Sequence, residues 1–307
     1  MVTFGRLLTA MATPFADDGS VDYARARELA NALLETGTEG IVVAGTTGES
    51  PTLNVEEKLR LFAEVKDIVG NRGTVIAGTC TYDTRESIHV SVEALRRGVD
   101  GILGTVPYYS KPPQQGLEAH FRAIADAIDG TPLILYNIPG RTAVNMAPET
   151  TLRLSEVPNI VGIKEASGNL DAIGTIIRES RPDFLVWSGD DAITLPILAI
   201  GGYGVVSVAS HLVGQQISRM ISSAIDGALD EATPIHHQLA PLIAALFATT
   251  SPIPLKYALA RCGFPCGSLR LPLVDIDDRS AAIMDAALAK TQIDLPTLGA
   301  PAPALSR

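Results

Sequence analysis

The sequence predicts an α/β fold, a (β/α)8 barrel with a C-terminal helical appendage. Eight short apolar runs rich in Val and Ile recur along the first two thirds of the 307 residues, with starts 20 to 34 residues apart. Amphipathic helical patterns lie between the runs, and after about residue 225 only helical patterns remain. Eight βα units of this size fit a closed barrel.

The apolar runs are short and lack the polar alternation of a half-exposed strand. Strands of a parallel sheet have this composition because helices cover one face and packed side chains cover the other. The eight expected strands are Leu7–Thr13, Gly40–Ala44, Thr74–Gly78, Gly101–Val106, Pro132–Tyr136, Ile160–Ile163, Phe184–Trp187 and Gly204–Val208. An open doubly wound sheet is the alternative, but no Gly-x-Gly-x-x-Gly opens a helix after the first strand, which argues against a dinucleotide site.

Helical patterns with one apolar stripe follow the early strands. Gly37 is expected to end the first helix, and Asn54 is expected to cap the second. The four clearest helices are Tyr23–Thr36, Asn54–Val69, Glu86–Arg97 and Leu117–Ile128.

The C-terminal region contains helical patterns separated by Pro, Gly and Asp. We expect a barrel over residues 1–224 and a helical region over residues 225–307. Its helices are expected at Pro234–Thr249, Pro252–Cys262 and Ser280–Ala289. The last segment, Leu295–Arg307, contains three prolines and is expected to be a loosely held terminus.

Composition excludes several classes of function. The net charge of −10 makes nucleic acid and anionic membranes poor partners, because both require a basic surface. No apolar stretch approaches the roughly 20 residues that cross a bilayer, and the N-terminus does not resemble a signal peptide. Cys80, Cys262 and Cys266 are an odd number without a disulfide pattern, so we expect reduced thiols in a cytoplasmic protein.

Lys164 is the first candidate for chemistry. It follows Ile160–Ile163 directly, at the carboxyl end of the sixth expected strand, where barrel enzymes place their active sites. The other five lysines fall where a charged head can reach water. An amine in apolar surroundings loses solvation, which favours its neutral form, and a neutral amine can attack a ketone to form an imine. Glu165 should point to the opposite face of the strand and leave Lys164 unpaired.

Tyr136 ends the preceding strand and should lie beside Lys164 at the same rim. A phenol next to an amine can carry protons during imine formation and aldol-type bond making. The structural alternative is a core aromatic whose hydroxyl is satisfied by a neighbour.

Three loops add polar groups near the same rim. The turn Gly45–Ser50 exposes backbone amides and the hydroxyls of Thr46 and Thr47, which suit a carboxylate, although it could be a purely structural turn. The proline-stiffened loop that carries Tyr108 and Tyr109 could wall the barrel mouth, reach a neighbouring subunit or simply pack. Arg141 follows the fifth strand, and a guanidinium suits bidentate capture of a carboxylate.

Metal binding is not expected. Asp190 and Asp191 are adjacent but have no partner ligands at suitable spacing, so capping of the next helix is the favoured interpretation. Cys262 and Cys266 lack a matching pair for zinc. His236 and His237 are expected on the surface, away from the rim.

Six segments together resemble the 4-hydroxy-tetrahydrodipicolinate synthase (dihydrodipicolinate synthase) family, the pyruvate-imine branch of the class I aldolases. The similarity runs in order from Thr9–Phe15 to the helical tail. The double threonine, Tyr109 and Arg141 separate this family from N-acetylneuraminate lyase. The segments are Gly45–Ser50, Pro107–Tyr109, Tyr136–Arg141, Ile163–Ala166, Ser188–Asp191 and Gly204–Val208.

The resemblance implies a lyase of lysine biosynthesis through diaminopimelate. Lys164 would form an imine with pyruvate, whose enamine attacks L-aspartate 4-semialdehyde. The resemblance also implies a homotetramer built from tight dimers, with no organic cofactor and no metal. Two alternatives remain: a related pyruvate-dependent aldolase acting on a sugar acid, and a barrel that has lost catalysis.

The resemblance assigns roles to six further residues around Lys164. Tyr136, Thr47 and Tyr109 would form a proton relay, with Tyr109 contributed by a partner subunit. Thr46 and Thr47 would hold the pyruvate carboxylate, and Val206 would contact the bound pyruvate. Arg141 would steady Tyr109 and grip the semialdehyde carboxylate.

The sequence departs from the family at one pocket. Relatives that lysine inhibits carry histidines and an asparagine at positions that are here Val55, Lys58 and Tyr82, while Ser50, Glu86 and Tyr108 are retained. A cationic Lys58 would repel a lysine ligand. We therefore expect feedback inhibition by lysine to be weak or absent.

Overall fold

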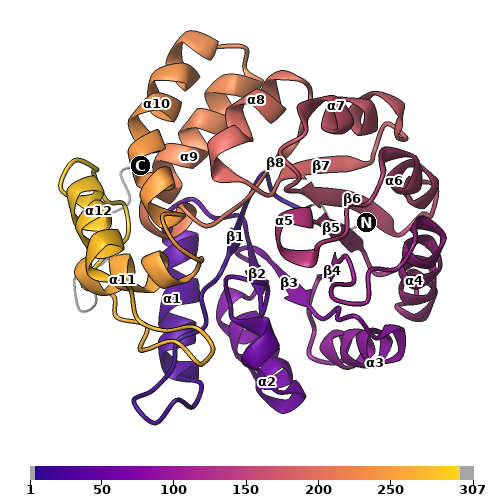
Figure 1. Cartoon of the computed structure of the whole chain (residues 1–307), viewed down its shortest axis with the longest axis horizontal. Helices are drawn as coiled ribbons and strands as arrows, with labels where there is room; N and C mark the ends of the chain where they lie inside the picture. The colour runs from indigo at the N-terminus through magenta and orange to yellow at the C-terminus, as the bar shows by residue number, and fades with distance from the viewer. Residues whose placement is uncertain (1–3, 298–307) are drawn as a thin grey trace.

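The computed structural model describes residues 4–297, and within it eight parallel strands close into a barrel (Figure 1). Each strand pairs with its neighbours in chain order, and β8 pairs with β1 to complete the closure. The strands are β1 (Leu7–Ala10), β2 (Gly40–Val43), β3 (Thr74–Gly78), β4 (Gly101–Thr105), β5 (Leu133–Asn137), β6 (Ile160–Glu165), β7 (Leu185–Ser188) and β8 (Gly204–Ser207). The predicted (β/α)8 barrel is confirmed.

Two apolar layers explain why the strands are hydrophobic on both faces. Side chains inside the barrel, among them Leu8, Ile76 and Val206, form one cluster that also contains Tyr136. Alternate strand residues such as Ile41 and Ile163 pack outward against the helices in a second, larger cluster. Burial on both faces is characteristic of parallel sheets.

In the part of the barrel region that the structure describes, nine helices and two 3₁₀ turns alternate with the strands. Asn54 caps α2 through a reciprocal pair of hydrogen bonds with Glu57, and Gly37 adopts φ 95° just after α1, as the sequence predicts. The helices are α1 (Tyr23–Glu35), α2 (Val55–Val69), α3 (Thr84–Leu95), α4 (Gln114–Ala127), α5 (Pro139–Thr142), α6 (Pro148–Ser155), α7 (Leu170–Glu179), α8 (Thr194–Ala199) and α9 (Ser210–Ile225), with η1 (Ser50–Thr52) and η2 (Asp191–Ile193).

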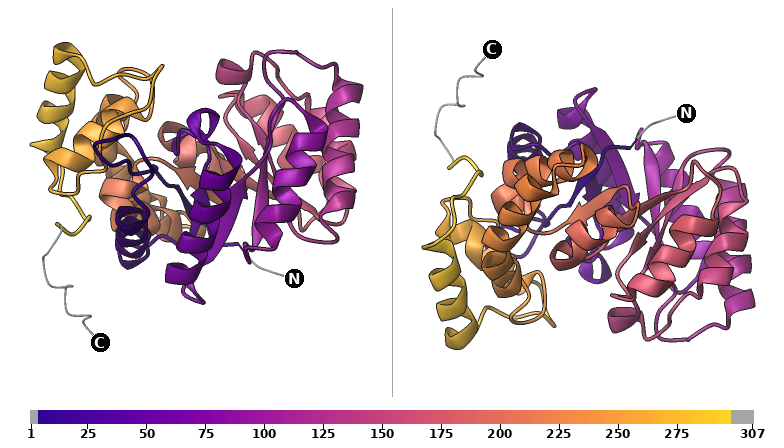
Figure 2. Two further views of the ribbon diagram at one scale, coloured as in Figure 1. Left: turned by 90° about the horizontal axis from the view of Figure 1, so that it is seen from below. Right: turned by 90° about the horizontal axis from the view of Figure 1, so that it is seen from above.

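Three further helices lie at one side of the barrel: α10 (Leu229–Leu246), α11 (Ile253–Arg261) and α12 (Asp278–Leu288) (Figure 2). The predicted start at Pro234 is wrong, because α10 begins five residues earlier and contains both Pro234 and Pro241. When proline occurs in a helix, it is most common at the first helical position. Here the buried side chains Ala232 and Leu239 extend the packed face of α10 across Pro234, so tertiary packing overrides the local preference.

The end of the chain differs in part from the expectation. Leu295 is buried against the rest of the molecule, so the start of the predicted loose terminus is anchored. Residues 298–307 of that segment lie outside the described range. Within residues 4–297, no helix combines the length and hydropathy needed to cross a bilayer.

Candidate active site

Lys164 lies at the carboxyl end of β6, where the backbone registers it between Tyr136 of β5 and Trp187 of β7. Its side chain is only 5% exposed. A Cβ atom added to Gly189 would lie 3.1 Å from both Cγ and Cε of Lys164. Gly189 therefore leaves the space through which the lysine side chain passes at the barrel mouth.

Tyr136 is the close aromatic neighbour of the amine. The Nζ atom of Lys164 lies 4.1 Å from the centroid of the Tyr136 ring, and Tyr136 is itself buried. Adjacent strands in register bring the two side chains to the same inner face, as the sequence predicts. The amine and the phenol are close enough for a ligand on the amine to contact the tyrosine.

Glu165 does not pair with Lys164, which agrees with the expectation from strand alternation. Its carboxylate accepts hydrogen bonds from the side-chain amide of Asn137, at 3.1 and 3.2 Å, and from the backbone N–H of Ser167 at 2.7 Å. Burial raises the pKa of Glu165, and these hydrogen bonds oppose the increase. The carboxylate stabilises the end of β6 and leaves the amine without a neighbouring anion on its own strand.

The turn after β2 presents Thr46 and Thr47. Thr47 is buried, whereas Thr46 lines a cavity of about 230 Å³ that also contacts Arg141 and Tyr108. The Thr13 hydroxyl donates to the Gly48 carbonyl at 2.7 Å and ties the turn to the loop after β1. A carboxylate at this turn would meet hydroxyl groups and backbone donors together.

Arg141 lies in the short helix α5, above the end of β5. Its Nη2 atom donates to the Ser251 carbonyl at 3.1 Å, which holds the guanidinium toward the C-terminal region. Among residues 4–297 the other N–H donors of the guanidinium have no hydrogen-bond partner, so they can meet a ligand. Arg141 contacts both the 230 Å³ cavity and a second cavity of about 430 Å³. The cation therefore lies between two hollows at the barrel mouth.

The larger cavity lies between the rim and α10. It is lined by Ala166, Gly189 and Asp190 from the barrel and by His236 and Phe247 from the C-terminal region. The expectation that His236 lies away from the rim is wrong. Helix α10 packs against η2, which follows β7, and so borders the same cavity as Gly189. The sequence contains no local pattern that predicts this contact.

Tyr109 does not lie in the site formed by its own chain. It adopts φ 67° in the loop after β4, and its side chain is 89% exposed. Val206, in contrast, lies inside the barrel on β8 beneath the mouth and is buried. Of the seven residues predicted for the site, Tyr109 is the one that the chain itself turns outward.

Asp190 caps η2, the element that follows β7, as the sequence predicts, whereas Asp191 binds the segment between β8 and α9. Asp190 accepts from the backbone N–H of Ala192 at 2.9 Å, and the buried Asp191 accepts from the backbone N–H groups of Val208 at 2.9 Å and Ala209 at 3.1 Å. Burial raises the pKa of Asp191. Within the described part of the chain, no three His, Cys, Asp or Glu side chains gather as a metal ion would require.

Two other lysines differ from their expected exposure. Lys58 and Lys256 are buried, although their helical positions predict contact with water. Lys256 pairs with Glu49, whereas Lys58 lines the 230 Å³ cavity. Burial lowers the pKa of both amines, and the nearby carboxylates of Glu86 and Glu49, respectively, oppose that effect.

Fold and site together define a (β/α)8-barrel protein with a buried lysine and tyrosine at the barrel mouth, the class to which barrel aldolases of the imine type belong. The model of the Dihydrodipicolinate synthetase family matches residues 3–291. The chain belongs to this family.

Relatives extend over nearly the whole chain. A 4-hydroxy-tetrahydrodipicolinate synthase from Dehalococcoides mccartyi is 55% identical over 296 residues, which cover 96% of this chain and 99% of that protein. The lysine-bound crystal structure of the enzyme from Cyanidioschyzon merolae superposes with a TM-score of 0.92 at 49% identity, covering 94% of this chain and 98% of that one. A variant described as the first monomeric dihydrodipicolinate synthase is 38% identical, with a TM-score of 0.91 and coverage of 94% and 96%.

Proposed function

We propose that the chain is a lyase that condenses pyruvate with L-aspartate 4-semialdehyde to give 4-hydroxy-tetrahydrodipicolinate, the first committed step of lysine biosynthesis through diaminopimelate. The observation that carries the proposal is the buried Lys164 amine, 4.1 Å from the Tyr136 ring, in a family member matched over nearly its whole length. Together they favour this activity over a sugar-acid aldolase.

Lys164 is the nucleophile of the reaction. Its neutral amine attacks the ketone carbon of pyruvate, and loss of water gives the imine. Loss of a methyl proton then gives an enamine, whose carbon attacks the aldehyde of the semialdehyde. The amino group of the second substrate finally adds to the imine carbon, so that the ring closes and Lys164 leaves as a free amine.

The residues around Lys164 transfer protons and bind the two substrates. Tyr136 and Thr47 pass protons during imine formation, and Tyr109 of a partner subunit completes the relay. Thr46 and Thr47 hold the pyruvate carboxylate, while Val206 packs against the bound pyruvate. Arg141 binds the carboxylate of the semialdehyde. We assign this second substrate to the 430 Å³ cavity, which Arg141 borders.

This chemistry needs no metal and no organic cofactor. The imine accepts the electron pair left when the methyl proton is lost, which a metal would otherwise do by polarising the ketone. We also propose a homotetramer assembled from tight dimers in the cytoplasm. The 89% exposure of Tyr109 supports an active site shared between subunits, since a phenol required for catalysis would otherwise be left in water.

Borohydride reduction in the presence of pyruvate tests the proposal. We expect a mass increase equal to one reduced pyruvate adduct, mapped by peptide mass spectrometry to Lys164, and we expect the Lys164→Ala variant to show no adduct. The absence of an adduct, or its location on Lys256, would refute the mechanism. Product formed from semialdehyde and pyruvate, without cleavage of N-acetylneuraminate, separates this activity from the sugar-acid alternative.

A further inference from the structure

A buried ion pair lies directly behind the turn that presents Thr46 and Thr47. The carboxylate Oε1 of Glu49 lies 2.7 Å from Nζ of Lys256, and both side chains are at most 3% exposed. Glu49 belongs to the turn after β2, whereas Lys256 belongs to α11, more than 200 residues later. The pair therefore joins the C-terminal region to the proposed carboxylate site.

The Lys256 ammonium group is held in place by contacts on several sides. Its Nζ atom also donates to the Ser268 carbonyl at 2.9 Å and lies 4.1 Å from the centroid of the Phe15 ring. The ammonium group is therefore surrounded by an ion pair, one hydrogen bond and an aromatic ring. Lys256 is a fixed cation whose charge is balanced by Glu49.

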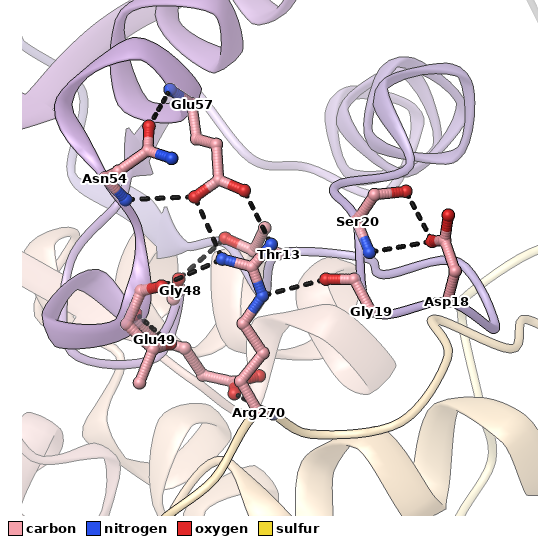
Figure 3. A network of polar contacts seen from close by, with 10 residues as sticks. Thr13, Asp18, Gly19, Ser20, Gly48, Glu49, Asn54, Glu57 and Arg270 are labelled. Carbon is pink, nitrogen blue, oxygen red and sulfur yellow. Dashed lines mark hydrogen bonds and ion pairs between the residues drawn. The ribbon is translucent and has the colours of Figure 1, made fainter.

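Arg270 connects the same carboxylate to a second ion pair (Figure 3). Its backbone N–H donates to Oε2 of Glu49 at 3.0 Å, while its guanidinium binds both carboxylate oxygens of Glu57 at 2.6 and 2.9 Å. The guanidinium also donates to the carbonyls of Gly19 at 2.9 Å and Thr52 at 2.8 Å. The loop after α11 is consequently attached to the C-terminal end of the turn, to the first turn of α2 and to the loop after β1.

The turn needs such an external constraint. Ala44 and Glu49, at its two ends, adopt φ of 53° and 54°, a left-handed conformation that is unfavourable for residues other than glycine. Strained backbone of this kind persists only where the surroundings fix it. Thr13 holds the turn from the β1 side at Gly48, and the Glu49 carboxylate is its attachment on the opposite side.

We propose that Lys256, acting through Glu49, is a positioning residue that sets the placement of Thr46 and Thr47 for the substrate carboxylate. The C-terminal region then contributes to pyruvate binding without any atom in contact with pyruvate. The inference rests on the proposed function for the identity of the ligand as a small 2-oxo acid.

The expected effect is specific to the first substrate. A displacement of about 1 Å at a binding site can reduce a rate by roughly 100-fold. We expect Lys256→Gln and Glu49→Gln each to raise the KM for pyruvate by about 10-fold or more. The KM for the semialdehyde should change by less than about 3-fold, because the 430 Å³ cavity is untouched. Any fall in kcat should reflect the displacement of Thr47, which also belongs to the proposed proton relay.

Arg261→Met is the matched control. Arg261 lies on the same helix, and its ion pair with Asp285, at 2.9 Å, is on the exposed surface. This variant also removes one cation from α11, and it should retain the wild-type KM for pyruvate. Thermal unfolding of every variant establishes that it is folded at the assay temperature.

The double variant Glu49→Gln/Lys256→Met keeps the inference testable if a single variant unfolds. It leaves no unpaired buried charge, so it should be more stable than either single variant. It should still show a raised KM for pyruvate, because the directed ion pair is gone. Folded variants with a KM within about 2-fold of wild type would overturn the inference. Absence of a borohydride adduct on Lys164 in the wild-type protein would instead refute the proposed function.

Discussion

At the scale of single residues, the placement of Lys164 depends on Gly189, which has no side chain beyond its Cα atom. Gly189 lines the 430 Å³ cavity. Because it lacks a Cβ atom, it leaves room for the aliphatic part of the Lys164 side chain. A methyl group at Gly189 would lie 2.8 Å from the Ala166 Cβ and 3.1 Å from two carbons of Lys164. These distances are below ordinary van der Waals contact, so either the lysine or the rim must move.

We therefore expect Gly189→Ala to lower kcat/KM by roughly 10-fold or more while the protein stays folded. Gly140→Ala is the control, because a Cβ at Gly140 meets no heavy atom within 4 Å. Steady-state kinetics and borohydride trapping measure the difference. Equal activity of the two variants would show that the rim absorbs the methyl group without displacing Lys164.

A second residue-scale property is the stability at acidic pH. His211 is fully buried, its Nε2 atom accepts from the Ala12 N–H at 3.1 Å, and its Nδ1 donates to the Val208 carbonyl at 2.8 Å. Burial lowers the pKa of His211 from 6.5 to about 4. Protonation would remove the acceptor for Ala12 and charge a buried ring.

The unfolded chain therefore binds a proton at higher pH than the folded chain does. Stability from this group is fully present above about pH 6.5 and is lost as the pH falls toward 4, by about 3 kcal/mol in total. The free energy of urea unfolding at pH 7 and pH 4.5 measures the loss, and His211→Gln should reduce it. His89→Gln, on the exposed face of α3, is the control for loss of a histidine side chain at the surface.

At the scale of elements, the turn after β2, helix α2 and the loop after β4 together form the 230 Å³ cavity. Lys58 of α2 contributes a buried ammonium group, with Ser50 and Tyr108 on the other walls. This geometry brings together three of the positions, Ser50, Lys58 and Tyr108, that the family resemblance assigned to a lysine-binding pocket. A second ammonium group in this cavity would be repelled by Lys58.

Inhibition by lysine is accordingly expected to be weak or absent. Inhibition at sub-millimolar lysine would contradict this prediction. Lys58→Gln removes the cation and should increase sensitivity to lysine, whereas Arg60→Gln removes a cation from the exposed side of the same helix and should not. Initial rates at fixed substrate and increasing lysine distinguish the two variants.

At the scale of the whole molecule, the proposed role of Tyr109 in a partner's site concerns a side chain that is 89% exposed on its own chain. Tyr108 precedes Tyr109 in the chain. The ring of Tyr108 packs edge to face against that of Tyr82, with 5.3 Å between the ring centroids. Tyr82 is also exposed, so solvent reaches aromatic side chains both on the loop after β4 and on the tyrosine packed against it. A partner subunit that covers this surface would receive Tyr109.

Subunit mixing tests the shared site. Tyr109→Phe and Lys164→Ala homo-oligomers should each be nearly inactive. In a mixed dimer, one site contains an intact Lys164 and receives an intact Tyr109 from the partner, so random mixing should restore about one quarter of wild-type activity. Activity that stays at the level of the parent variants, despite subunit exchange shown by native mass spectrometry, would place Tyr109 outside the partner's site.

The barrel itself follows from local sequence properties. Buried strands and amphipathic helices are encoded by short-range hydrophobic patterns, so their order and number are predictable without tertiary information. The positions of Lys164 and Tyr136 are also predictable, because residues at the carboxyl ends of adjacent parallel strands meet at one rim. Boundaries differ where packing competes with local preference, as in α10 across Pro234.

Only the tertiary structure decides how distant segments complete the site. The sequence determines that a lysine, a tyrosine and a threonine turn face the barrel mouth. It does not reveal that Lys256 is buried against Glu49, or that His236 borders the cavity beside Gly189. These contacts depend on how the C-terminal helices return to the barrel. That return is set by the summed packing of many apolar side chains across the chain, and no local pattern records it.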